Sequence, residues 1–124
     1  MGEPLANVER AVLLAISDQY PEHKMAIQQQ LVSASVLERT NTGVGFYITF
    51  TVEGGSLLTD VNAPLGAVLV DVVGLERGLA FLLWPKDGRL GVLEGHVWGE
   101  ETAEMNLCTV EHSNVRPERT PTAH

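Results

Sequence analysis

The chain has 124 residues, 44% of them hydrophobic, which is the usual size of a single domain with its own core. Sixteen acidic residues against eight Lys and Arg give a net charge of −8, and the basic stripe typical of nucleic-acid-binding proteins is missing. We therefore expect no nucleic-acid partner. The acidic balance suits a basic protein partner or, more simply, solubility.

Two helices are predicted at the start of the chain. Apolar residues recur every three or four positions between residues 5 and 16, which predicts a helix over residues 4–19 with its apolar stripe against a sheet. Pro21 favours the first turn of a second, shorter helix over residues 21–30.

Residues 32–52 predict an antiparallel hairpin. Gly43 suits the left-handed position of a three-residue turn over residues 40–43. In that register Val36 lies opposite Ile48 on an apolar face, while Ser and Thr fill the other face. This hairpin is therefore expected to be solvated on one side.

A polar connector over residues 53–64 leads to a strand at Val68–Val73. The strand is apolar on both faces except at Asp71, and a charge in this context favours an edge strand. Exposed apolar area on Val68–Val73 would support a homodimer, which we keep as an alternative.

Residues 77–97 predict a second hairpin around the turn sequence PKDG. With a three-residue turn, Phe81 lies opposite Leu93 on a surface that we expect under the helices. On the other surface Ala80 lies opposite Glu94, which predicts a shallow concavity there.

The candidate site is Glu94, His96 and Trp98 on that concave surface. A carboxylate beside an imidazole can hold one tautomer and raise its basicity, which makes a usable general base. Three further residues could complete a metal-ligand set of nitrogen and oxygen atoms: Glu100, Glu101 and His112. The simpler interpretation is a solvated pair on an acidic strand face.

Cys108, the only cysteine, could act as a nucleophile beside His96 or His112, but a small buried hydrophobe on a short strand over residues 105–111 is the simpler expectation. His23 is expected at the surface. We expect one domain over residues 1–112 and a flexible tail over residues 113–124, where apolar periodicity is lost.

The common hydrolase, nucleotide and zinc signatures are missing from the sequence, so we predict no cofactor and leave open whether the chain is an enzyme. The short apolar run over residues 11–16 has no basic leader, so we expect neither a signal peptide nor a membrane partner. A single cysteine favours a cytoplasmic location.

Four stretches carry a resemblance: NTGVGFY at residues 41–47, GLAFLLW at 78–84, DGRL at 87–90 and LEGHVWGEE at 93–101. They resemble a set of small uncharacterised bacterial proteins. The resemblance implies a bacterial cytoplasmic α+β protein and brings no catalytic residue with it.

The sequence thus predicts an α+β domain in which one or two N-terminal helices pack on a mainly antiparallel sheet of five or six strands built from hairpins. The leading hypothesis is a non-enzymatic interaction or accessory protein, for example an antitoxin-like inhibitor, that uses the acidic stretch Glu94–Glu111 against a basic protein. The alternative is a small-ligand-binding or metal-assisted enzyme that uses Glu94 and His96.

Overall fold

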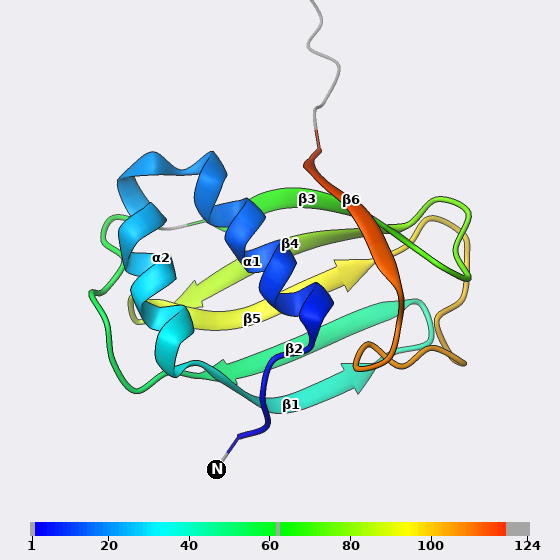
Figure 1. Ribbon diagram of the computed structural model, residues 1–124, viewed down its shortest axis with the longest axis horizontal. Coiled ribbons are helices and arrows are strands. Elements are labelled where there is room, and N and C mark those ends of the chain that lie inside the picture. The colour runs from blue at the N-terminus through cyan, green and yellow to red at the C-terminus, as the bar shows by residue number, and fades with distance from the viewer. Residues whose placement is uncertain (1, 62, 119–124) are drawn as a thin grey trace, which may run out of the picture.

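The computed structural model describes residues 2–61 and 63–118, and its architecture is the predicted α+β fold. Two helices, α1 (Asn7–Gln19) and α2 (Pro21–Ser33), come first. Six strands follow: β1 (Ser35–Asn41), β2 (Gly45–Thr51), β3 (Leu65–Val72), β4 (Leu79–Lys86), β5 (Arg89–His96) and β6 (His112–Pro117). They form one antiparallel sheet in the order β1-β2-β5-β4-β3-β6, which is not closed. Figure 1 shows both helices on the same face of this sheet.

The helices meet at a sharp junction formed by Tyr20 and Pro21. A residue before proline avoids helical backbone, and Tyr20 has φ −126° and ψ 79°. Pro21 then begins α2, which continues to Ser33, so Val32 lies on a helix and not in the first hairpin as predicted. Among the described residues, no helix combines the length and apolar character that crossing a bilayer requires.

The core lies between the helices and one side of the sheet, which we call the helix-facing side. The strand side chains that are almost fully buried there are Val36, Phe46, Ile48, Phe50, Leu65, Val68, Val70, Val72, Leu79, Phe81, Leu83, Leu90 and Leu93. Val12, Ile16 and Ile27 of the helices belong to the same cluster. The prediction that Phe81 and Leu93 share the buried surface is confirmed.

The register of the second hairpin differs from the prediction by two residues. Asp87 and Gly88 both have positive φ, 52° and 79°, which is the two-residue type I′ turn rather than a three-residue loop. This turn shifts the pairing by one residue, and an irregularity between Trp84 and Pro85 shifts it by one more, so Leu82 lies opposite Glu94 and Phe81 lies opposite Gly95 instead of Leu93. A Cβ at Gly95 would lie 2.7 Å from Phe81 Cε1, so glycine leaves the space that this ring occupies.

The register of the first hairpin is also corrected. Val36 lies opposite Phe50, not Ile48. The pairing shifts between Val36 and Glu38, so Leu37 is an extra residue on β1 and its side chain is 63% exposed. The bulge turns Arg39 toward the helices.

Two predictions about the third strand and the end of the chain are wrong. β3 is not an edge strand, because β6 pairs with its outer side. Asp71 is accommodated because its carboxylate accepts hydrogen bonds from Arg116 and Asn114 on β6. Residues 113–117 therefore belong to a strand and not to a flexible tail, while residues 119–124 of the predicted tail lie outside the described residues.

The segment 97–111 connects β5 to β6 as turns and not as the predicted strand over residues 105–111. Buried Thr102 fixes it to the β1–β2 turn: its hydroxyl accepts from Gly45 N–H (3.0 Å) and donates to Asn41 Oδ1 (2.8 Å). The stretches that carry the resemblance, 41–47 and 93–101, thus flank a structural contact between two turns.

Gln30 fastens α2 to the turn of the second hairpin. Its side chain is fully buried, and its Nε2 donates to Ser56 O (2.8 Å) and Gly88 O (2.9 Å). Its Oε1 accepts from Leu90 N–H (2.8 Å). The amide nitrogen and the amide oxygen of the buried Gln30 side chain therefore both have hydrogen-bond partners in place of water.

Candidate functional site

The side of the sheet opposite the helices carries the most promising surface. We call it the open face, and its central residues are Glu38, Tyr47, Thr49, Leu69, Ala80, Leu82, Trp84, Val92, Glu94 and His96. These positions alternate with the buried side chains of the helix-facing side. Tyr47 and Trp84 are each 44% exposed, although aromatic side chains of this size are usually more buried.

Glu94 lies near the middle of the open face. Its cross-strand neighbours are Tyr47 on β2 and Leu82 on β4. Trp84 Nε1 donates a hydrogen bond of 2.9 Å to Glu94 Oε1, which ties the indole ring to the carboxylate. A carboxylate is therefore held among aromatic and aliphatic side chains.

His96 and Trp98 extend the open face toward the end of β5. His96 lies opposite Gly45 and Ala80, and its ring meets Trp98 edge-on with 5.3 Å between centroids. Glu94 and His96 share one face, as the alternation of a strand predicts. Because Leu82 and not Ala80 lies opposite Glu94, the predicted hollow beside the carboxylate is filled by a leucine side chain.

The additional ligands predicted for a metal do not converge on this surface. Glu100 binds elsewhere: its two carboxylate oxygens accept from the backbone N–H groups of Glu76 (2.8 Å) and Arg77 (3.0 Å). These hydrogen bonds hold the pKa of Glu100 below its usual value. Across residues 2–61 and 63–118, no three His, Cys, Asp or Glu side chains gather as a metal site would require.

Cys108 is exposed, which corrects the prediction of a small buried hydrophobe. The neighbouring Leu107 takes the buried position instead, because residues 106–109 form a turn and not a strand. Cys108 and His112 both line a surface cavity of about 500 Å³.

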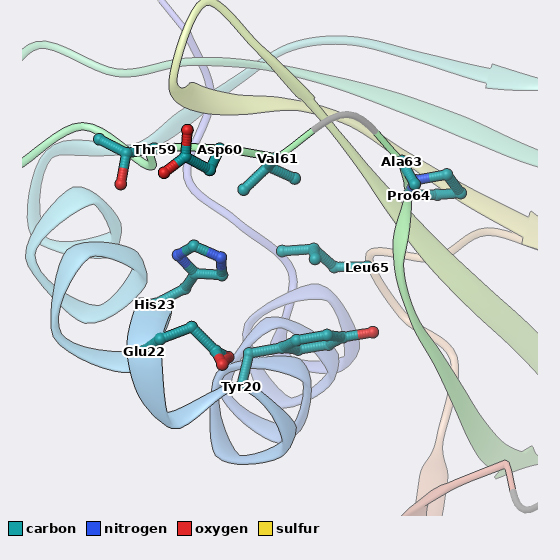
Figure 2. Close-up of a pocket in the computed structure, with 9 residues that line it drawn as sticks. All are labelled: Tyr20, Glu22, His23, Thr59, Asp60, Val61, Ala63, Pro64 and Leu65. Carbon is teal, nitrogen blue, oxygen red and sulfur yellow. The ribbon is translucent and has the colours of Figure 1, made fainter.

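A second cavity, of about 530 Å³, lies between the start of α2 and the connector to β3. Figure 2 shows His23 inside it, with the carboxyl groups of Glu22 and Asp60 on either side of the imidazole in this view. Sequence reasoning placed His23 at the surface, whereas it is half-buried. No local pattern reveals this site, because the fold alone brings residue 60 to residue 23.

Comparisons with protein-family models, curated proteins and solved structures found no match to this chain. Its function is therefore inferred from the geometry and chemistry of the chain itself.

Proposed function

We propose that the protein is a non-enzymatic protein-binding module whose open face recognises a partner segment that combines apolar side chains with Lys or Arg. The proposal rests on the pair Trp84 and Glu94. The exposed indole ring of Trp84 is hydrogen-bonded to the Glu94 carboxylate near the centre of a sheet face that no helix covers. Tryptophan and tyrosine are the residue types most enriched where binding energy concentrates in protein interfaces.

Charge supports a basic partner. Asp71 on this side of the sheet is already paired with Arg116 at 3.2 Å, whereas Glu38 is exposed beside Thr49. Within the described residues, Glu94 accepts only the bond from Trp84, through Oε1, so Oε2 can accept from a partner's cation. A Lys or Arg there would also lie close to the faces of Trp84 and Tyr47, where cation–π attraction adds to the charge pair.

The acidic stretch Glu94–Glu111 does not act as one surface in this proposal. Glu94 is on the open face, while Glu100 binds the β3–β4 turn. An antitoxin-like inhibitor of a basic protein is one role that fits such a module. The exposed free thiol of Cys108 supports a reducing compartment such as the bacterial cytoplasm.

The enzyme alternative at Glu94 and His96 has less support. An imidazole that acts as a general base is usually oriented by a carboxylate hydrogen-bonded to it, and among the described residues no hydrogen bond joins Glu94 to His96, while Glu94 Oε1 accepts from Trp84. The first experiment therefore tests peptide binding to the open face.

Selection from a phage-displayed random peptide library on the intact protein tests the proposal. We expect enriched peptides that combine aromatic or branched apolar residues with Lys or Arg. Trp84→Ala should weaken their binding, measured by fluorescence anisotropy, by about 30-fold, the effect of losing a central interface residue worth ~2 kcal/mol. Trp84→Phe should give an intermediate loss, because the apolar ring stays while the contact to Glu94 is lost.

Met25→Ala is the matched control, because Met25 is an apolar side chain, 71% exposed, on α2 at the other side of the molecule. Its affinity should equal that of the unmodified protein, and circular dichroism should show all variants folded. Equal binding of the selected peptides to Trp84→Ala and Met25→Ala would refute the proposed surface.

A further inference from the structure

The contact between Trp84 and Glu94 makes the two oxygens of the carboxylate unequal. Oε1 accepts the indole N–H of Trp84 at 2.9 Å, whereas Oε2 accepts no hydrogen bond from the part of the chain that the structure describes. Trp84 lies on β4 and Glu94 on β5, so the indole reaches across the hairpin to a single oxygen. A cation that arrives from solvent therefore meets a carboxylate with one oxygen already in use.

The two basic side chains bind a carboxylate in different ways. The guanidinium of arginine is a planar fork that pairs best with both oxygens, through two parallel hydrogen bonds. The ammonium of lysine is a compact charge that needs one acceptor oxygen and has no plane to align. At Glu94 a guanidinium that bridges both oxygens must share Oε1 with Trp84 or displace the indole. An ammonium can bind Oε2 and leave the indole in place.

The neighbours of Glu94 suit the rest of a lysine side chain. Leu82 and Tyr47 lie opposite it on the adjacent strands, and Val92 lies two residues before it on the same side of β5. The four-carbon stem of a lysine can pack on Leu82 and Val92 while its ammonium reaches the carboxylate. The exposed ring of Tyr47 adds cation–π attraction.

The charge of Glu94 is not neutralised by the chain's own basic residues. The central residues of the open face include neither Lys nor Arg. Arg116 on β6 is paired with Asp71 at 3.2 Å. Lys86 and Arg89 lie opposite each other beside the turn of the second hairpin. Within residues 2–61 and 63–118, no ion pair joins Glu94 to a basic side chain, so its carboxylate can attract a partner's cation.

We propose that the open face selects lysine over arginine in its partner segment, and that the indole N–H of Trp84 determines this specificity. The inference rests on the proposed function, because it specifies the partner's chemistry at Glu94. Trp84 then has two roles. Its ring supplies apolar contact area, and its N–H occupies the oxygen that a guanidinium fork would use.

Peptides from the phage selection, resynthesised with Lys, Arg or norleucine at the basic position, test the inference. Their Kd values for the full chain are measured by fluorescence anisotropy. We expect the Lys peptide to bind about fivefold more tightly than the Arg peptide, because only the guanidinium competes with the indole for Oε1. The norleucine peptide, which keeps the stem without the charge, should bind at least about tenfold more weakly than the Lys peptide.

Trp84→Phe keeps an aromatic ring and removes the N–H, so it should abolish or reverse the preference for Lys by opening Oε1 to the guanidinium. Glu94→Gln should also abolish the preference, and it should bring the Lys and norleucine peptides to similar affinity. Trp98→Phe is the matched control, because it makes the same change in a ring that meets His96 instead of Glu94. It should keep the fivefold preference, and circular dichroism should show all three variants folded.

Two results would overturn the inference alone: an Arg peptide that binds as tightly as the Lys peptide, or a preference for Lys that Trp84→Phe leaves unchanged. In either case, peptide binding that is lost in Trp84→Ala would still support the proposed function. A library that yields no peptide for the open face would overturn both.

Discussion

Arg39 is the residue on which the N-terminal part of the structure converges. Its guanidinium forms two hydrogen bonds with the fully buried carboxylate of Glu9, at 2.6 and 2.9 Å, and further bonds with Glu3 and the Pro4 carbonyl. The bond to Glu9 is the main reason that the pKa of Arg39 is raised. Glu9 also accepts from Ala6 N–H at the start of α1, so the pair joins the helix to β1.

We expect Arg39→Met to lower the free energy of unfolding by about 3 kcal/mol, because it leaves the Glu9 carboxylate buried without its cation. Urea denaturation at neutral pH measures this loss. The double variant Glu9→Met/Arg39→Met should recover a large part of it, because the buried charge is then removed as well. Lys24→Met, which breaks the exposed pair with Asp18, is the control and should cost less than about 1 kcal/mol. A loss no larger than that of the control would show that the Glu9–Arg39 pair adds nothing to stability.

Among the elements, the segment 97–111 has the least regular structure but is tied to two turns. Glu100 closes the β3–β4 turn through two backbone N–H groups, and Thr102 closes the β1–β2 turn. The sequence indicated neither contact, because each joins residues more than twenty positions apart and hydrogen bonds of single side chains leave no periodic pattern.

Glu100→Gln should lower the melting temperature at neutral pH, because an amide offers one acceptor oxygen where the carboxylate offers two. The pKa of Glu100 is lower in the folded chain than its ordinary value of 4.5. Its stabilisation is therefore fully present above about pH 4.5 and lost as the pH falls through the lower folded value. The difference between Glu100→Gln and the unmodified protein should accordingly shrink in acid.

Calorimetry or thermal scans across pH measure this difference. Glu104→Gln, an exposed acid of the same segment, should leave the melting temperature unchanged at every pH. A Glu100→Gln difference that is constant from neutral to acidic pH would contradict the role assigned to the carboxylate.

At the scale of the whole molecule, the open face disfavours a symmetric contact between copies of the chain. A symmetric dimer through this face would bring Glu94 of each copy close to the other near the two-fold axis, and two buried carboxylates repel. The alternative dimer through Val68–Val73 would have little apolar surface, because Val68, Val70 and Val72 are buried under the helices and only Val73 of this segment, 69% exposed, is open to solvent to a large extent. We therefore expect a monomer in solution at neutral pH, measured by light scattering.

Glu94→Leu should promote self-association, because it removes the repulsion and enlarges the apolar surface around Trp84. Glu101→Leu, a change of the same kind at an exposed position of the segment 97–111, should remain monomeric. A stable dimer of the unmodified protein that Glu94→Leu leaves unchanged would place the contact between copies elsewhere.

The sequence by itself determined the fold class, the two helices, the two hairpins and the core-facing side of the central strand residues such as Phe81 and Leu93. It could do so because these features follow from the short-range periods of hydrophobic residues, about 3.6 in a helix and 2 in a strand. The placement of Glu94 and His96 on one face depended only on that period.

Only the tertiary structure decided which strand residues lie opposite each other and which residues line the two cavities. The type I′ turn at Asp87, a pairing shift between Trp84 and Pro85 and a bulge at Leu37 changed the registers of the two hairpins, so Leu82 became the partner of Glu94. They also moved two side chains from the predicted solvent side to the helix-facing side, Leu90 into the core and Arg39 onto Glu9. β6 has no apolar pattern and forms because its backbone pairs with β3 and its Arg116 forms an ion pair with Asp71 of that strand. Such contacts join distant parts of the chain, and their energy depends on three-dimensional proximity that no local pattern encodes.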